Sequence, residues 1–475
     1  MEAVKIVLKK PSVYYFPKKP VNFDTNSPSW MIDALPMQTE RRELMDTGTR
    51  LKYHRLKSKM SIEEVASGIL PSRELKKIEA GTKAPSLPDL QALCKKLDIP
   101  LAPKDNPIGK VLVKNFKTSL LNPQNKGKIM EQYADIHDHP LLHIDEDVEL
   151  EYRVQQIRYF NITGDLDSAE EKIKDMERFK EFMNQEQYYL FQKYKGNYDY
   201  LLNDYEQALK TYLVAEKISP PSLSASELGD LYFSIGLTAT QCWVYNLAYK
   251  YSELALKIYQ QEFVPKRIAE CHLNIAINER RVGNFKTAKE HYKHALTIGQ
   301  KLDNDVLKFS TEYNYGYFYF QFQNFELAIY HLENALNYTP PEYTSHILMD
   351  YCMLIKCHIE MSDMESAEDL LSKGYNILIE KNLSLDTPSN NLFKEVYIEF
   401  MSLYYYLNDD FSKFEEYIVD KLIPIFESHH KFFEIGFYYG YLGNTYNKLG
   451  HFEKSAQAFY KATQAYKKLM TFNEE

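Results

Sequence analysis

Asn274 and Asn314 stand 40 residues apart in the C-terminal two-thirds of the chain, and their amides are suited to holding a peptide backbone. An Asn side chain can donate to a backbone C=O and accept from a backbone N–H at once, whatever the sequence of the ligand. Each such hydrogen bond contributes only about 1 kcal/mol, so several must act in a row. The spacing therefore favours a repeated surface that binds an extended peptide. The alternative is a solvated polar face that binds nothing.

Small residues with nearly the same period indicate which elements carry these asparagines. They form three sets: Ala208, Ala248, Ala288, Ala328 and Ala367; then Ala215, Ala255, Ala295, Ala335 and Gly374; and Gly196, Gly236, Ala276 and Gly316. A fixed period of this size is typical of a solenoid, and small residues allow its helices to approach closely. With turns such as Gly283-Asn284-Phe285, the pattern resembles the tetratricopeptide repeat. We expect an all-α fold in which about eight such helix pairs, in residues 145–475, coil into a right-handed superhelix.

The first helix of each pair is expected to line the concave surface of this superhelix. Such continuous surfaces bind extended peptides or other proteins. The repeat frame places these candidate peptide-binding residues on it: Gln241 in the third pair, Asn274 and Arg281 in the fourth, and Asn314, Tyr317 and Gln321 in the fifth. The 39 tyrosines are best explained by packing within the repeats.

Residues 46–103 contain the helix-capping and turn residues that are typical of a small helical bundle. Ser61 to Glu64 is a capping box, Pro71 suits the first turn of the next helix, and Gly81 suits its end. A further helix follows Pro85-Ser86. Two short helices joined by a tight turn within such a bundle indicate a helix-turn-helix domain.

This segment resembles the Cro/C1-type helix-turn-helix family. The resemblance implies that Arg55 pairs with Glu79 and ties the first helix to the recognition helix. Ile62 departs from the family, which usually has a DNA-contacting Gln at this position, and this difference puts tight or specific binding in doubt.

The segment is also locally basic: between Asp46 and Lys104 there are twelve Lys and Arg against seven Asp and Glu, a surplus of five. Because the start of the second helix faces the base edges, Ser72, Arg73 and Lys76 are candidates there, and Arg73 can read guanine. We interpret Arg50, Lys52 and Lys77 as phosphate contacts or solvated charges.

The bulk composition narrows the function classes. A net charge of −9 argues against coating nucleic acid along the whole chain. Five scattered cysteines indicate reduced thiols, and no apolar run suits a membrane helix or a signal peptide, so we expect a cytoplasmic protein that binds no membrane. The motifs of phosphate-binding loops, nucleophile elbows and metalloproteases are missing, so we expect no enzyme and no cofactor.

Two further segments flank the helix-turn-helix segment. Residues 1–45 are interpreted as an irregular N-terminal extension, and residues 104–144 as a partly helical linker. His137, His139 and His143 in the linker fit no metal-ligand spacing, so no metal site is expected.

Over residues 46–475, the two parts in this order resemble the RRNPP family of peptide-sensing regulators of Gram-positive bacteria, most of all its NprR branch. The resemblance implies a cytoplasmic quorum-sensing transcription regulator that binds a short signalling peptide in its groove. Asn274 and Asn314 would clamp the peptide backbone, and Arg281 would meet a peptide carboxylate. It also implies a homodimer or higher homo-oligomer on a palindromic double-stranded operator.

Two alternatives keep this fold and change its output. The chain would either inhibit a sporulation phosphorelay response regulator under peptide control, or serve as a regulator of a phage or mobile element.

Overall fold

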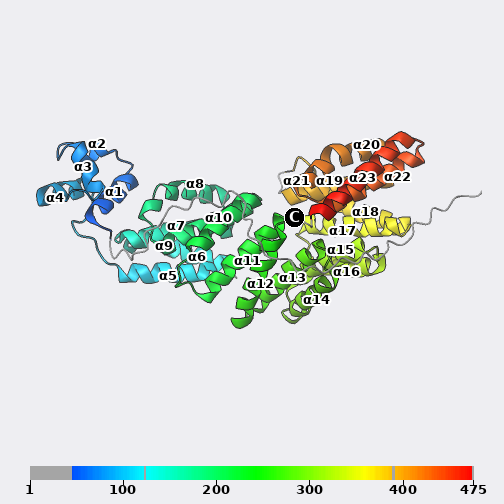
Figure 1. Cartoon of the computed structure of the whole chain (residues 1–475), viewed down its shortest axis with the longest axis horizontal. Helices are drawn as coiled ribbons and strands as arrows, with labels where there is room; N and C mark the ends of the chain where they lie inside the picture. Colours follow the sequence, from blue (N-terminus) through cyan, green and yellow to red (C-terminus); the bar gives the residue numbers. More distant parts are fainter. Residues whose placement is uncertain (1–44, 122, 124, 138, 388–390, 473–475) are drawn as a thin grey trace, which may run out of the picture. The chain divides into compact units, whose positions relative to one another are not determined.

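The computed structural model describes residues 45–472, apart from 122, 124, 138 and 388–390 (Figure 1). The irregular extension predicted for residues 1–45 lies outside the described residues, except for Met45. The described secondary structure is helical throughout, which confirms the predicted all-α fold. None of the described helices combines the length and the hydropathy that a bilayer crossing requires.

Four short helices form the N-terminal bundle: α1 (Thr47–Lys57), α2 (Ile62–Ala66), α3 (Ser72–Glu79) and α4 (Leu87–Lys96). Ser61 caps α2 through its hydroxyl, and the side chain of Glu64 returns to the Ser61 backbone, which completes a capping box. Gly81 follows α3 with a φ of 69°, a left-handed conformation that glycine adopts without strain. Leu51, Val65, Leu75, Ile78 and Leu93 form the buried centre of the bundle.

Two helices and a short 3-10 turn connect this bundle to the repeats: α5 (Pro107–Leu121), α6 (Lys126–His137) and η1 (Pro140–His143). All three pack against the first repeat helix, and Val113, Phe116 and Ile129 are buried in their common core. Residues 104–144, interpreted as a partly helical linker, thus form helices that pack against the first repeat.

Eight helix pairs follow, which agrees with the predicted repeat body. They are α7 (Glu146–Thr163) and α8 (Leu166–Glu177); α9 (Gln185–Leu201) and α10 (Tyr205–Ile218); α11 (Ala225–Gln241) and α12 (Tyr245–Gln261); α13 (Pro265–Arg281) and α14 (Phe285–Lys301); α15 (Asp305–Gln321) and α16 (Phe325–Tyr338); α17 (Thr344–Glu360) and α18 (Met364–Glu380); α19 (Asn391–Leu407) with α20 (Phe411–Glu416), η3 (Tyr417–Leu422) and α21 (Ile423–Ser428); and α22 (Phe432–Lys448) and α23 (Phe452–Phe472). A short 3-10 turn, η2 (Lys180–Phe182), lies between the first two pairs.

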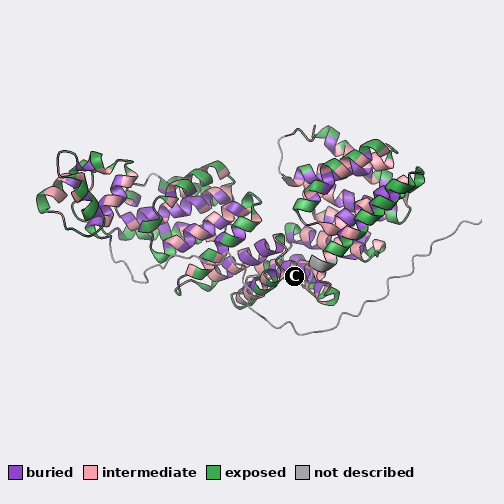
Figure 2. Ribbon diagram, turned by 45° about the horizontal axis from the view of Figure 1, so that its top comes forward, coloured by how far each residue is buried: buried purple, intermediate pink, exposed green. Residues whose placement is uncertain are grey.

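Small residues sit where the two helices of a pair cross. Ala208, Ala248, Ala288 and Ala328 have no exposed surface. A Cβ added at Gly316 would lie 2.7 Å from Leu332 Cγ, a distance that real side chains do not tolerate. The period in the sequence therefore reports the close approach of helices within each pair. Buried residues accordingly lie on the faces where helices meet (Figure 2).

The first helices line the inner side of the stack. Each one from α7 to α17 contacts the next first helix, whereas second helices such as α12, α14 and α16 pack on the first helix of the following pair. In a curved stack, elements of one kind approach most closely on the shorter, concave side. The residues predicted to bind peptide belong to these first helices.

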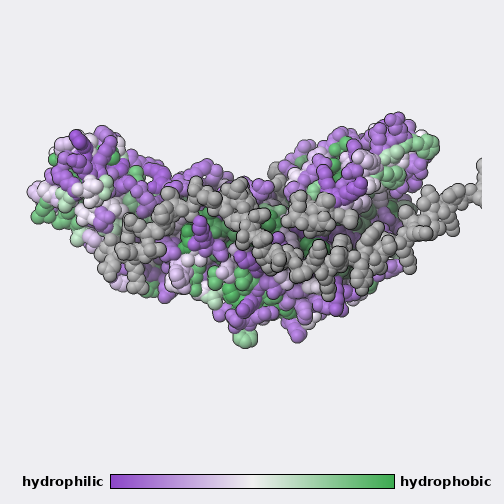
Figure 3. Space-filling model, in the orientation of Figure 1, coloured by the Kyte–Doolittle hydropathy of each residue, from purple (hydrophilic) through white to green (hydrophobic). Residues whose placement is uncertain are grey.

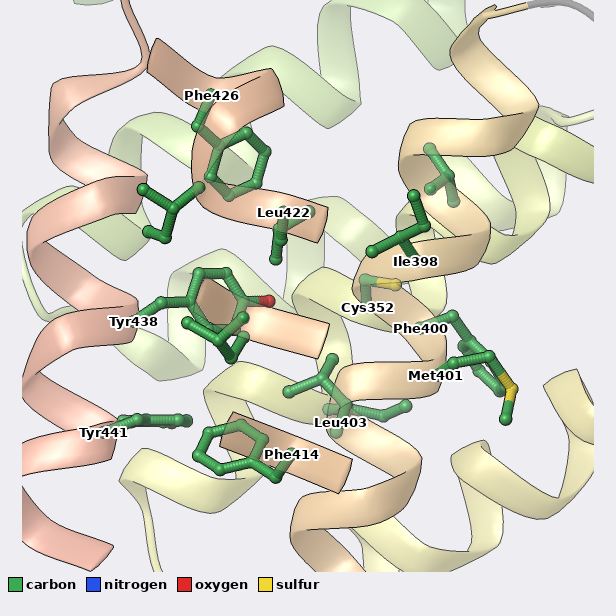
Figure 4. Packing of buried hydrophobic residues seen from close by; sticks show 14 of the residues in the cluster. Cys352, Ile398, Phe400, Met401, Leu403, Phe414, Leu422, Phe426, Tyr438 and Tyr441 are labelled. Atoms are coloured by element: carbon green, nitrogen blue, oxygen red, sulfur yellow. The ribbon is translucent and has the colours of Figure 1, made fainter. Parts of the chain in front are cut away.

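The seventh pair departs from the pattern of the others. Its second helix is broken into α20, the π-helical η3 and α21. Pro424 cannot donate a backbone hydrogen bond to the preceding turn, which accounts for the wider turn before it. Phe414, Leu422 and Phe426 still fill the space between α19 and α22 (Figure 4).

Three histidines give the fourth pair a pH-dependent stability. His272 Nδ1 lies 2.9 Å from His291 Nδ1, and the His272 ring stacks on His294 with 5.1 Å between centroids. Burial, His291 and His294 together lower the pKa of His272 to about 4. The folded chain therefore holds His272 neutral at pH values where the unfolded chain protonates it, and stability falls as pH drops from 6.5 towards 4.

We predict that His272→Gln removes part of this acid sensitivity. The variant should lose less stability than the wild type between pH 7 and pH 5, by roughly 1–2 kcal/mol after allowance for solvent screening. Thermal unfolding at both pH values measures the difference. His451→Gln, at an exposed site, is the matched control. Equal losses in the wild type and His272→Gln would contradict the prediction.

Candidate DNA-binding and peptide-binding sites

The start of α3 presents an accessible basic surface. Arg73, Lys76 and Lys77 are exposed, and Ser72 is half-buried. In the opposite direction, Leu75 and Ile78 hold the helix in the bundle core. The predicted base-reading residues therefore share one helix whose polar face is open.

A buried ion pair fixes α3 to α1. Arg55 Nε and Nη2 donate to the two Glu79 carboxylate oxygens at 2.7 and 2.8 Å, and Arg55 Nη1 also donates to the Met60 carbonyl. Two parallel bonds between a guanidinium and a carboxylate restrict orientation as well as distance. Ile62 is half-buried and packs against the same core. It thus supports the bundle where the related family carries a DNA-contacting Gln.

The other face of α1 is docked on the repeats, and here the structure differs from the prediction for Arg50. Arg50 is only 4% exposed, donates to Glu146 Oε1 at 2.5 Å and to the Pro100 carbonyl at 2.8 Å, and so cannot reach a phosphate in this arrangement. Lys52 likewise pairs with Glu181 at 2.5 Å, although that pair is partly exposed. These charges serve a contact between domains because acidic residues of α7 and η2 face them.

Two buried carboxylates of α7 carry this junction. Glu146 also accepts from His54 at 2.8 Å, and Glu149 accepts from Tyr53 at 3.0 Å and from Lys57 at 2.8 Å. Burial would raise the pKa of Glu146, but the hydrogen bonds from His54 and Arg50 lower it to about 2. Burial also opposes the charge of Glu149, but its hydrogen-bond donors and the charge of Lys57 lower its pKa to about 2. Both groups remain charged across the physiological pH range.

Aromatic packing completes the junction. Tyr53 has no exposed surface, and its ring meets Phe179 and Phe182 edge-on at 5.4 and 5.6 Å between centroids. Charged and apolar contacts thus hold α1 against the first repeat while the polar face of α3 stays open.

On the inner side of the repeats, Asn274 differs from the prediction. Its amide is 4% exposed and donates to Ser252 Oγ of α12 at 2.7 Å. Asn278, one turn later, donates to Thr240 at 2.7 Å, and Arg281 donates to the Thr240 carbonyl. This stripe of α13 therefore faces the preceding helix pair and not the concave side. Residues on either face recur every 40 residues, so the spacing alone does not distinguish them.

The other predicted groove residues are more accessible. Asn314 is half-buried and donates to the Ser310 carbonyl at 2.8 Å, while Gln241 is exposed at the end of α11. Tyr317 donates to Glu434 of α22, and Gln321 donates to Tyr317 Oη at 3.2 Å and accepts from Arg280. The C-terminal pair therefore reaches the inner face of the fourth and fifth pairs.

A small polar cavity lies in the earlier part of the same inner side. It has a volume of about 120 Å³, and Arg158, Asn197, Asp230 and Arg267 are among its lining residues. Asp230 accepts from Lys193 at 2.9 Å and from Arg267 at 3.3 Å, and although burial opposes its charge, these cations lower its pKa to about 2. The cavity can take a short polar group.

Several residues that the structure places at these candidate sites were not predicted from the sequence. Arg280, Glu434 and the Glu146–Glu149 pair belong to no motif, and their contacts span repeats or domains. One signal was present: Trp243 stands 40 residues before Gly283, where the repeat frame places a turn glycine. Within the described ranges, His, Cys, Asp and Glu side chains nowhere form a group of three that could hold a metal ion.

Comparison with known proteins supports both parts of the chain. Residues 51–103 match the helix-turn-helix family HTH_3. The transcriptional activator NprA of Geobacillus stearothermophilus is 26% identical over 416 residues, which are 86% of this chain and 100% of NprA. The response regulator aspartate phosphatase E of Bacillus subtilis is 23% identical over 342 residues, which are 68% of this chain and 86% of that protein.

A solved relative shares the fold. The apo form of the quorum sensor NprR from B. thuringiensis superposes with a TM-score of 0.59 and 19% identity, covering 75% of this chain and 98% of NprR. NprR in complex with its cognate peptide NprX gives a TM-score of 0.55 and 18% identity, covering 74% of this chain and 96% of NprR.

The chain thus combines a helix-turn-helix domain, the head, with a tetratricopeptide-like repeat body. The chain is similar to NprA over most of its length and shares its fold with NprR, which agrees with the resemblance to the RRNPP family predicted from the sequence.

We predict that Glu146→Gln releases the head from the repeats. Removing one partner of a buried ion pair leaves Arg50 with an uncompensated charge, a change that costs about 3–5 kcal/mol. Trypsin should then cleave faster in the connection around Lys104, while the helical circular dichroism of the body is retained. Glu181→Gln, which removes a partly exposed pair on the same junction, is the control. Equal cleavage rates for the two variants would show that Glu146 does not hold the junction.

Proposed function

We propose that the protein is a cytoplasmic quorum-sensing transcriptional regulator that binds a short signalling peptide on the inner side of its repeats and thereby changes DNA binding. The observation that carries the proposal is the combination of an open basic face on α3 with a repeat body whose inner side holds convergent Asn, Gln, Tyr and Arg side chains. The proposal assigns no catalytic step.

On DNA, the start of α3 enters the major groove. Arg73 reads a guanine edge through its planar fork, Ser72 and Lys76 contact neighbouring positions, and Lys77 contacts the phosphate backbone. Two heads of a homodimer read the two halves of a palindromic operator. Since each head is held to its first repeat through Glu146 and Glu149, a change in the repeats changes the spacing of the heads.

On the inner side, Asn314 clamps the peptide backbone, and Tyr317, Gln321, Arg281 and Gln241 surround it. Asn274 joins this set only in an arrangement that frees its amide from Ser252. A peptide shifts the population of protomer arrangements by its difference in affinity for them. NprR, whose fold the chain shares, is known in complex with a cognate peptide.

A second function deserves a direct test: peptide-controlled binding of a response regulator. The similarity to response regulator aspartate phosphatase E over 68% of this chain favours it. Copurification of DNA or of a response regulator with the protein distinguishes the two functions. A regulator of a phage or mobile element would also copurify with DNA. The genes that lie beside its coding sequence would identify that role.

We predict that Arg73→Ala weakens binding to the operator by about 1–3 kcal/mol and binding to random duplexes much less, because it removes a base contact. Fluorescence anisotropy on an operator selected from random duplexes measures both affinities. Lys77→Ala is the control, since loss of a phosphate contact weakens both classes of DNA equally. An equal loss for Arg73→Ala would make it a phosphate contact.

We predict that Asn314→Ala lowers affinity for the signalling peptide several-fold, because one backbone hydrogen bond contributes about 1 kcal/mol. Calorimetric titration with a peptide selected from a random library measures the change. Asn408→Ala is the matched control: Asn408 also donates to the carbonyl four residues before it, at 2.9 Å, but is exposed in the turn directly after α19. Unchanged affinity with intact helical signal would remove Asn314 from the site.

A further inference from the structure

Helix α23 has one buried face and one exposed face. Small residues that pack towards α22 form the buried face: Ser455, Ala458, Ala462 and Ala465. The exposed face carries two rows of residues in which each member follows the last by seven positions: Phe452, Phe459 and Tyr466 in one row, and Glu453, Tyr460 and Lys467 in the other. A seven-residue spacing keeps side chains along one side of a helix, as in helices that pack lengthwise on another helix.

In the earlier pairs, the positions equivalent to these aromatic residues are buried. The residue four positions after the small crossing residue is at most 5% exposed in the second to sixth pairs: Tyr212, Ser252, Tyr292, Leu332 and Leu371. Phe459, four positions after Ser455, is 41% exposed. Tyr466 is 37% exposed, whereas Thr339, at the equivalent position of α16, is 8% exposed. The last pair thus exposes aromatic rings on the face that earlier pairs keep buried.

The composition of this face suits a protein partner. Tyr460 is 66% exposed and Phe452 is 70% exposed, and together with Phe459 and Tyr466 they place four aromatic rings on one side of one helix. Aromatic residues are enriched at the centres of protein interfaces. A contiguous exposed apolar patch on a soluble protein marks an interaction site.

The charges on α23 indicate which partner fits. Glu453 lies in the first turn of the helix, Lys467 lies near its end, and Tyr460 is midway, seven residues from each. If two copies of α23 pack antiparallel with Tyr460 at the crossing, Glu453 of each copy lies opposite Lys467 of the other. The face is therefore complementary to itself, which is the condition for a contact with two-fold symmetry.

The other end of the repeat array is already covered. Helices α5 and α6 and the η1 turn pack against α7, and Val113 and Phe116 are buried in their common core. A head-to-tail contact, in which the last pair of one copy stacks on the first pair of the next, would require that side to be open. Two copies can instead meet through the same face.

We propose that α23 binds a second copy of this chain through its exposed face, as an antiparallel helix pair centred on Tyr460. We call the exposed residues Phe452, Glu453, Phe459, Tyr460, Tyr466 and Lys467 the α23 face. The inference rests on the homodimer of the proposed function and assigns the surface that forms it.

A first experiment compares Tyr460→Glu with Tyr330→Glu in the full-length chain. Both tyrosines are exposed on second helices, Tyr330 by 58% on α16, so the same charge enters a similar environment and only one change lies on the α23 face. Sedimentation velocity over a concentration series measures the dissociation constant of the dimer. Tyr460→Glu should raise it roughly ten-fold or more, because a charge then enters the centre of the interface, and Tyr330→Glu should leave it unchanged.

A second experiment exchanges the charges. Glu453→Lys places like charges at both ends of the antiparallel pair, and so does Lys467→Glu, so each variant alone should dimerise roughly ten-fold more weakly than the wild type. An equimolar mixture of the two variants restores both opposite-charge pairs and should dimerise about as tightly as the wild type. Circular dichroism of each variant checks that α23 remains helical. A mixture that dimerises as weakly as its components would contradict the antiparallel pairing.

The outcomes separate this surface from the homodimer itself. A Tyr460→Glu chain that dimerises as tightly as the wild type would overturn the α23 face and leave the homodimer to another surface. A wild-type chain that stays monomeric throughout the series would overturn both. Calorimetric titration with the selected peptide tests the receptor function separately, because the α23 face contains none of the predicted peptide-binding residues.

Discussion

The close crossing of two helices at a small side chain is the constraint on which the rest of this structure depends. Where Gly316 lies, the partner helix comes so near that one added carbon would collide with it, and Ala288 at the equivalent kind of crossing has no exposed surface. Each pair is set by its own crossing and by contact with its neighbours. The inner side therefore depends on the crossings that hold the first helices in line.

Charge divides the helix-turn-helix head into two functional faces. Arg50, His54 and Lys57 are committed to carboxylates of the first repeat, whereas Arg73 and Lys76 remain open on the opposite helix. A count of basic residues alone overstates the surface available to a phosphate backbone. The hydrophilic residues visible over much of the molecular surface in Figure 3 likewise do not by themselves indicate which charges are free.

Local patterns were sufficient to predict the fold, because helix caps, turn residues and helix crossings depend on neighbours within one repeat. Site residues were harder. Asn274 and Arg281 were recognisable as one stripe of α13, since seven residues are nearly two helical turns. Whether that stripe faces the concave side or the preceding pair depends on how pairs are rotated, and the spacing contains no such information.

Contacts across repeats were beyond sequence reasoning altogether. Tyr317 meets Glu434 across 117 residues, and neither residue belongs to a motif that anticipates the other. Trp243 was the exception in principle, since a large ring at a glycine position of the repeat is unusual, yet its partner His429 could only be found in space.

The broken second helix of the seventh pair has a mechanical consequence. In an uninterrupted array, the direction of each hairpin is the sum of many small, equal rotations. The π-helical turn at Tyr417–Leu422 interrupts that sum just before the final hairpin. The orientation of α22 is consequently set by a few residues around one irregular turn. Substitutions there could change the orientation of the last helix pair without altering any residue that contacts a ligand.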